Sequence, residues 1–421
     1  MELLNNTSLS NNLDITGTRE GDRLNIAHWL FLLFWLLKPF YLWESGSMQV
    51  SDFIFVLSFV AWLLYNRGNI HIDGYNLLFA AFIGYTYLIN IIYMLVLSDV
   101  SYLISSIYYT YNFFVILAFS DFKKNKVFLK SLLWVSVANL FIQLAMLMMG
   151  MGSYFWNNYR FMGSFNDPNQ FSFSMFTSFL IVFVLSQYLY NQFMRSYSII
   201  ALGTLLLSLY FIVQGSSTGM LLGLAVFMAM LVLSILNLEK APAFVFLKFI
   251  GILLVIIIII FVAMVGFSGP DLDASPNSNS FLVKRLIGKF NIIENGGIAG
   301  LLKDRGMDKT INYPYYLIFG AGEGNYINRF PGTTNHEVHS TLPGILFAYG
   351  LIPFILLCVW IWHHLRDMNM MLVPVYIALL IESLTLANQR QPAFWIIIML
   401  GSLSYVDRSD HRRFRLTRKV W

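Results

Sequence analysis

The segment NHEVHS, just ahead of the apolar run TLPGILFAYGL, gathers two histidines and a glutamate. His336 and His339 are three residues apart, with Glu337 between them. A zinc hydrolase of the His-Glu-x-x-His type needs a spacing of four to place both ligands and the general base together, so we predict no metal here. A histidine in this position can accept a proton near neutral pH, or form a hydrogen bond at the start of a helix. We favour the second interpretation for His336.

Two arginines in short segments between apolar runs are candidates for binding an anion. Arg160 lies in NNYRFMGSFNDPNQF, close to Asn166 and Asn169, and Arg390 lies in NQRQP. The guanidinium group offers a rigid fork of donors that matches a phosphate or a carboxylate. We therefore predict that both arginines bind an anionic partner. The alternative is that they pair with phospholipid headgroups or, for Arg160, with Asp167.

The composition places these polar residues in a membrane protein. The chain has 421 residues, of which 57% are hydrophobic, 17% aromatic and only 12% charged, far more apolar than a soluble core of this length requires. The single cysteine, Cys358, lies in an apolar segment, which excludes a disulfide framework and a thiolate metal site. Residues 1–25 lack the apolar core and cleavage site of a signal peptide.

A membrane-spanning helix needs about 20 apolar residues. Reading the chain at about that length gives about twelve candidate spans, with boundaries good to a few residues: 26–43, 49–65, 75–97, 102–119, 127–150, 171–188, 197–213, 218–236, 244–267, 341–362, 370–387 and 393–406. An even number places both termini on one side of the membrane. The segments on that side hold fifteen lysines and arginines, whereas the short loops on the other side hold only Arg160 and Arg390. The positive-inside rule therefore predicts that both termini are cytoplasmic.

The same analysis leaves one large external loop, residues 268–340. Within it, FLVKRLIGKFNII carries Arg285 and predicts an amphipathic helix able to lie along the bilayer surface, and IAGLLKDRGMDKTI carries Arg305. The glycines of FGAGEGNY could bring backbone N–H groups to an anion, but a nucleotide loop would need a following Lys-Ser/Thr, so we favour a turn. The predicted organisation is a cytoplasmic tail, nine helices, the loop, three helices and a basic cytoplasmic tail, at 1–25, 26–267, 268–340, 341–406 and 407–421.

The order of these pieces resembles the O-antigen polymerase and ligase superfamily of bacterial membrane glycosyltransferases. RFMGSFNDPNQ is similar to that family's Arg-x-x-Gly followed by Pro-Asn, and Arg305 ahead of YYLIFGAGEGNY is similar to its arginine and glycine-rich segment. EVHSTLPGILFAYGLIP resembles its His-Asn/Ser-x-x-Leu and Gly-Leu element. The chain departs from the family at Thr218 in GSSTGMLLGL, where many members carry an arginine. A contact made there must be lost, or supplied by Arg285, Arg305 or Arg390.

The resemblance implies an all-α, GT-C-like integral membrane fold and a polysaccharide polymerase. Such an enzyme transfers a glycan linked to undecaprenyl diphosphate onto a sugar hydroxyl of another lipid-linked repeat unit. The reaction takes place on the outer face of the bacterial cytoplasmic (inner) membrane, during O-antigen, capsule or exopolysaccharide assembly. The resemblance implies no metal and no cofactor. The partners it implies are the lipid-linked donor and acceptor and the membrane. A co-polymerase that regulates chain length is a possible further partner, and nucleic acid is not expected.

This chemistry assigns roles to the candidate residues. Cations must bind the diphosphate and stabilise charge as the glycosidic bond breaks, and a base must lie near the attacking hydroxyl. By resemblance, Arg160 and Arg305 take the first role and His339 the second, while Glu337 orients or polarises His339. Further contacts to the diphosphate or the glycan are expected from Arg285, Arg390, Asn166 and Asn169.

Two alternatives stay open. A ligase of the same family would transfer the glycan to lipid A-core; we favour the polymerase because polymerases are the more varied group and because Thr218 replaces the usual arginine. A proton-coupled secondary transporter would account for twelve spans and for Glu382 in the eleventh one, where an ionisable group needs a partner or water. No inverted repeat is evident, however, and the strong charge features lie on the outer face.

Overall fold

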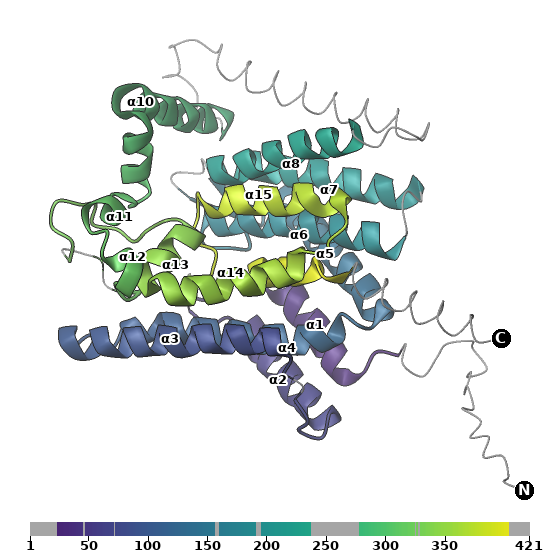
Figure 1. Ribbon diagram of the computed structural model, residues 1–421. Coiled ribbons are helices and arrows are strands. Elements are labelled where there is room, and N and C mark those ends of the chain that lie inside the picture. The colour runs from purple at the N-terminus through teal and green to yellow at the C-terminus, as the bar shows by residue number, and fades with distance from the viewer. Residues whose placement is uncertain are drawn as a thin grey trace, which may run out of the picture.

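The computed structural model describes residues 23–44, 47–70, 72–155, 160–190, 195–236, 278–324, 326 and 329–403. These residues form a bundle of apolar helices with a group of short helices at one end (Figure 1). The predicted ninth span, 244–267, and the tail 407–421 lie outside the described residues, as does all but the end of the tail 1–25. The described part of the chain is mostly helical, as the composition predicts.

Seven of the eight described helices before the long loop follow the predicted segments to within a few residues, whereas the first ends at Leu37, well before the predicted end at 43. The eight helices are α1 (Ile26–Leu37), α2 (Val50–Tyr65), α3 (Gly74–Leu97), α4 (Tyr102–Phe122), α5 (Lys126–Met148), α6 (Pro168–Leu189), α7 (Arg195–Gln214) and α8 (Thr218–Leu236). Among the described residues, α3, α4, α5, α6 and most of α7 are long and apolar enough to cross a membrane, and five further apolar helices are shorter. The chain is therefore a membrane-embedded helical protein.

Helix α6 is the central element of the bundle. The most apolar window of α6 is 78% buried, against 28% for the peripheral α3. Asp167 starts α6, because its side chain accepts hydrogen bonds from the backbone N–H groups of Asn169 and Gln170 while Pro168 occupies the first turn. Helices from distant parts of the sequence pack together: α15 (Val373–Ser383) lies against α8, and α14 (Leu351–Leu365) lies against α3 (Figure 1).

The predicted span 341–362 is wrong in one respect, because it consists of two helices. These are α13 (Thr341–Tyr349) and α14, with Gly350 between them. Gly350 has a φ of 81°, and a Cβ there would lie 2.3 Å from the carbonyl oxygen of Ile318. Only glycine permits this conformation and this close approach. The break lets the loop helix α12 (Tyr316–Phe319) contact the bundle.

One short stretch of the described chain is not helical but forms strands. A short antiparallel hairpin, β1 (Ser153–Phe155) with β2 (Arg160–Gly163), connects α5 to α6. Strand β2 is buried and β1 is exposed, because Phe161 packs against Phe171 and Phe211 of the bundle. The hairpin therefore holds Arg160 in a fixed position against the helices.

The loops that the sequence predicts on the outer side of the membrane lie together at one end of the bundle. The α1–α2 connection meets the β2–α6 turn, where Tyr41 N–H donates to Ser164 C=O over 3.0 Å. At the other end, the connection after α4 meets the segment after α16 (Pro392–Leu400), where Lys123 Nζ donates to Ser402 Oγ over 2.6 Å. The bundle thus has two chemically distinct ends, and the long loop belongs to the first.

The described part of the long loop is helical and carries the predicted amphipathic segment. It contains α10 (Ser278–Asp304), which is kinked at Gly297, and the short helices α11 (Asp308–Asn312) and α12. Leu282 and Val283 of α10 are buried, and α10 contacts α7 and α8. An aromatic cluster attaches the rest of the loop to α13; it contains Tyr313, Tyr316, Tyr326, Phe330 and Phe347.

Candidate functional site

A cavity of about 390 Å³ opens at the loop end of the bundle. This volume lies within the range of about 300–1,000 Å³ that is common for small-molecule sites. Four of the residues predicted from the sequence line it: Asn169, Glu337, His339 and Arg390. They come from the start of α6, the segment before α13 and the α15–α16 connection, so the cavity joins three parts of the chain that are far apart in sequence.

The extended segment before α13 turns Glu337 and His339 to the same side. Both line the cavity, whereas Val338 between them is 4% exposed and packs in the aromatic cluster of the loop. This alternation is the period of two that an extended backbone imposes. The N-cap of α13 is Ser340, so neither histidine caps the helix. His336 is hydrogen-bonded, as we favoured: its Nδ1 lies 2.9 Å from the carbonyl oxygen of Glu337, and its ring stacks on that of His339 with centroids 4.9 Å apart.

His339 has the properties of a neutral imidazole that can accept a proton. Burial lowers the pKa of its side chain from the usual 6.5, and Glu337 only partly opposes this shift. Within the described ranges, no side chain or backbone group forms a hydrogen bond with its ring nitrogens. Its backbone N–H donates to the carbonyl oxygen of Arg305 over 2.9 Å, which fixes the backbone while leaving the ring available to a ligand.

Arg390 is held between two carboxylates. Its Nη2 lies 2.8 Å from Glu323 Oε1 and 3.2 Å from Glu337 Oε2, and its Nε lies 3.2 Å from Glu323 Oε1. The carboxylate of Glu337 therefore pairs with Arg390 and forms no hydrogen bond with His339. The expected orienting role of Glu337 on His339 is thus replaced by an ion pair, although its charge still acts on His339.

Glu323 is the residue that the sequence did not reveal as part of the site. It is 5% exposed and accepts hydrogen bonds from Tyr349 Oη at 2.7 Å and Tyr109 Oη at 3.2 Å. Gln389 Nε2 also lies 3.3 Å from the carboxylate atom that binds Arg390. The sequence did offer one signal, the acidic residue inside the glycine run FGAGEGNY. Burying this charge against the helices would be costly unless it had a partner.

The glycine run is a turn and does not form an anion cradle. The backbone N–H groups of Ala321 and Gly322 donate to Phe347 C=O and Ala348 C=O, at 2.9 and 2.7 Å. A Cβ on Gly322 would lie 2.7 Å from the ring of Tyr93. The glycines therefore allow the loop to pack closely on α3 and α13 and to deliver Glu323 to Arg390.

The other three predicted arginines form what we call the arginine row: Arg160, Arg285 and Arg305. Each donates to a backbone carbonyl: Arg160 Nε to Gly215 at 2.9 Å, Arg285 Nη1 to Ser216 at 2.7 Å, and Arg305 Nη1 to Thr385. The members are close enough to affect one another. Burial, and then Arg285, lower the pKa of Arg160 to about 10, while burial and Arg305 lower the pKa of Arg285.

The positive charge of the row is weakly compensated. Within the described part of the chain, the only carboxylate in ion-pair contact with the row is Asp304, 3.7 Å from Arg305 Nε, and Asp304 also binds Lys289. Arginine stays protonated at neutral pH even when its pKa falls to about 10. The row is therefore a concentration of unmatched cations, which is the electrostatic requirement for binding a polyanion.

Two members of the row lie near Thr218. Arg285 is bound to Ser216 C=O, two residues before Thr218, and Arg305 is bound to Thr385 C=O beside Gly219, where a Cβ would lie 2.2 Å from Thr385 Oγ1. Both guanidinium groups thus lie at the start of α8. Arg390, the third residue considered, is engaged by carboxylates elsewhere.

The two predicted asparagines have different surroundings. Asn166 donates to Trp43 C=O over 2.6 Å and ties the α1–α2 connection to the turn before α6; it does not line the cavity. Asn169 lines the cavity and accepts a hydrogen bond from Arg160 Nη2 at 2.9 Å. Arg160 itself is 4% exposed and does not line the cavity, so Asn169 is its link to that space.

Glu382 lies behind the cavity at the end of α15. Its Oε1 accepts a hydrogen bond from Asn388 Nδ2 at 2.6 Å, and Asn388 lines the cavity. Its Oε2 is buried with no hydrogen-bond partner among the described residues. Glu382 thus has an internal partner on one carboxylate oxygen only.

Comparison with known proteins adds no identification. No family model matches the chain, and no curated protein sequence matches it. Across the described residues, no three His, Cys, Asp or Glu side chains are grouped as they would be around a metal ion.

Proposed function

We propose that this protein is a metal-independent glycosyltransferase of the bacterial cytoplasmic membrane. It transfers a glycan from undecaprenyl diphosphate to a sugar hydroxyl of another lipid-linked repeat unit, and so polymerises a surface polysaccharide. The observation that carries the proposal is the junction of the arginine row with His339. The hydrogen bond from His339 N–H to Arg305 C=O places a neutral base that lines the cavity next to the arginine row, whose three members lie outside the cavity lining.

The reaction needs both features at once. The acceptor oxygen forms a bond to the anomeric carbon of the donor, and the bond from that carbon to the diphosphate oxygen breaks. The electron pair of the broken bond stays on the diphosphate, where cations stabilise the developing charge. The proton of the acceptor hydroxyl passes to a ring nitrogen of His339.

The roles of the arginines follow from their accessibility. Arg285 and Arg305 are partly exposed, so they bind the diphosphate directly. Arg160 is buried and holds Asn169 at the cavity edge, so its role is to position Asn169 and to add positive charge to the row. Arg390, already matched by two carboxylates, positions Glu337 and the α15–α16 connection in place of binding phosphate.

Both termini face the cytoplasm in this proposal, and the loop end faces outward. Support comes from the charge distribution of the sequence, since the end opposite the loop carries Lys123, Lys124 and Arg366. Reporter fusions test the orientation: a reporter at Asn125 is expected to be cytoplasmic and one at Asn295 external. A cytoplasmic reporter at Asn295 would contradict the mechanism, because lipid-linked units are polymerised on the outer face.

The decisive experiment uses purified protein in lipid nanodiscs with lipid-linked repeat units. We expect longer lipid-linked glycans together with release of undecaprenyl diphosphate, and the same rate in a chelator. Absence of both products with active substrate would refute the function, and loss of activity in EDTA would restore the metal alternative. Preferred transfer to lipid A-core would identify a ligase. Proton-driven solute uptake by the same protein in vesicles would identify a transporter.

A further inference from the structure

One wall of the cavity carries none of the residues assigned to the proposed chemistry. It is formed by the C-terminal end of α1, the segment before α2 and one face of α4. We call it the tyrosine wall; it consists of Tyr41, Tyr108 and Tyr111 together with Lys38. The wall combines aromatic faces with phenolic and ammonium donors, so it can contact apolar and polar parts of one ligand.

The tyrosine wall is fixed in place before any ligand binds. Asp52 accepts from Lys38 Nζ at 2.6 Å and from Tyr111 Oη at 2.7 Å. Gln49, which is 1% exposed, holds the preceding segment through hydrogen bonds with the backbone of Leu42 and Trp43. A preorganised wall spends little binding free energy on ordering its side chains.

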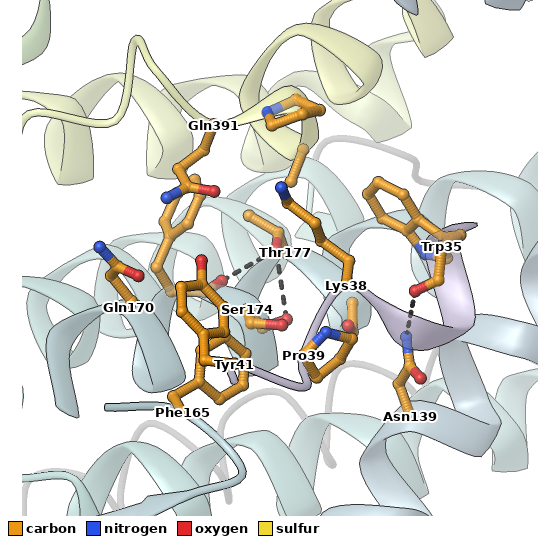
Figure 2. Close-up of a pocket in the computed structure, with 14 residues that line it drawn as sticks. Trp35, Lys38, Pro39, Tyr41, Asn139, Phe165, Gln170, Ser174, Thr177 and Gln391 are labelled. Carbon is orange, nitrogen blue, oxygen red and sulfur yellow. Dashed lines mark hydrogen bonds between the residues drawn. The ribbon is translucent and has the colours of Figure 1, made fainter. Parts of the chain in front are cut away.

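A small recess continues from the cavity into the bundle, and Figure 2 shows Lys38, Tyr41, Gln170 and Gln391 around it. These four residues line both the cavity and the recess. The recess has a volume of about 30 Å³, enough for one or two waters or for a ligand hydroxyl, but not for a ring. Hydroxyl side chains of α6 line its inner surface: Ser174, Thr177 and Ser178.

Gln170 supplies the clearest sign that a ligand group belongs there. Its side-chain Oε1 is shielded from solvent and has no hydrogen-bond partner in the described structure. A buried amide oxygen without a partner costs about 1–3 kcal/mol, so such atoms in native proteins usually meet a ligand or an ordered water. Gln170 follows Asn169, which links this side of the cavity to the arginine row.

We propose that the tyrosine wall and Gln170 form the binding site for the sugar that accepts the glycan. The sugar ring lies against Tyr41 and Tyr108, and one of its hydroxyls donates to Gln170 Oε1 at the mouth of the recess. Another hydroxyl faces His339 across the cavity. This subsite rests on the proposed function, and it gives the two substrates separate places: the diphosphate at the arginine row and the acceptor glycan at the tyrosine wall.

The chemistry of the wall favours a neutral saccharide over the other parts of the substrate. Lys38 is paired with Asp52, so the wall presents no unmatched cation to a phosphate. The side-chain amides of Gln170 and Gln391 disfavour an isoprenoid tail, since an apolar chain would leave polar atoms such as Gln170 Oε1 unsatisfied. Sugar hydroxyls satisfy these atoms, while the C–H face of the ring covers the aromatic surface.

The test separates the two substrates kinetically. Protein in nanodiscs receives the lipid-linked repeat unit as donor, and lipid-free oligosaccharide repeat units released from the host cell's own polysaccharide are titrated as acceptor. We expect Tyr108→Ala and Gln170→Ala to raise the acceptor KM at least about tenfold, while the donor KM changes less than about twofold. The matched control is Tyr65→Ala, because Tyr65 is 68% exposed at the far end of α2.

Saturation-transfer NMR provides a readout that does not depend on turnover. The free oligosaccharide is expected to show transfer from wild-type protein without donor, and reduced transfer from Gln170→Ala, a substitution at a partly exposed side chain that leaves its backbone bond to Asp167 in place. Wild-type turnover with an unchanged acceptor KM in both variants would overturn the subsite and leave the proposed function standing. Failure of the wild type to transfer any glycan would instead refute the function itself.

Discussion

The arginine row and the Arg390 site show how the same side chain serves two purposes in one protein. Arg390 contacts two carboxylates, of Glu323 and Glu337, and its charge is fully matched inside the protein. Arg285 and Arg305 donate mainly to backbone carbonyls, which supply hydrogen bonds but no negative charge. The difference teaches that an arginine's partners, more than its presence, decide whether it binds an external anion or stabilises the fold.

The largest effect on the rate is expected at His339, whose segment contacts both the arginine row and Arg390. His339→Ala should lower kcat by about 10²–10⁴-fold, the usual contribution of a positioned general base, while His336→Ala stays near normal. Rates measured with lipid-linked repeat units test this. Wild-type turnover in His339→Ala would leave the histidine with a packing role only.

The same histidine sets an expected pH dependence. Its neutral form is the base, and burial lowers its pKa below 6.5. The rate should therefore be flat above about pH 6.5 and fall as the pH drops through a value below that, where the imidazole becomes protonated. An inflection above pH 7 would assign the base to another group.

The next largest effect on the rate is expected for the arginine row, whose charges have few carboxylate partners, unlike that of Arg390. Arg285→Ala and Arg305→Ala should each reduce the rate by about 10²–10³-fold, because each removes a cation that stabilises the departing diphosphate. Lysine at either position should restore little, since a point charge lacks the planar fork of donors. The control is Arg366→Ala, an exposed arginine at the opposite end of the bundle. Normal activity in both alanine variants would reduce the row to a headgroup anchor.

The stability of the fold should depend on Arg390 and its carboxylate partners. Glu323→Gln should lower the free energy of unfolding by about 3 kcal/mol, because it leaves Arg390 without its buried partner. Glu337→Gln should cost less than about 1 kcal/mol, since Glu337 is 38% exposed. Denaturant titration in detergent micelles measures both. Equal losses in the two variants would contradict the distinction between the buried and the exposed carboxylate.

The smallest effect is expected at Glu382. Glutamine keeps the oxygen that accepts from Asn388 Nδ2, so Glu382→Gln should alter glycan transfer by less than about tenfold, the worth of one hydrogen bond. Proton-coupled transport would instead be abolished, because the titrating group is gone. A complete loss of glycan transfer would give Glu382 a role in the chemistry.

Several features followed from the sequence because they depend on neighbouring residues. The long apolar helices come from composition alone, and the predicted 218–236 coincides with α8. Glu337 and His339 both line the cavity because side chains two residues apart in an extended segment point to the same side. The break at Gly350 was missed because 341–362 is apolar on both sides of it, and only the close approach of Ile318 demands the glycine.

The tertiary structure decided which polar groups meet. Glu323 and Arg390 are 67 residues apart, and Arg305 and Thr385 are 80 apart, so no local pattern could pair them. The sequence by itself determined that this chain belongs in a membrane and that its arginines and His339 needed explanation, because burying charge in an apolar protein is costly. Which arginines are matched by carboxylates, and which are left for a ligand, depended on the packing of distant loops at one end of the bundle.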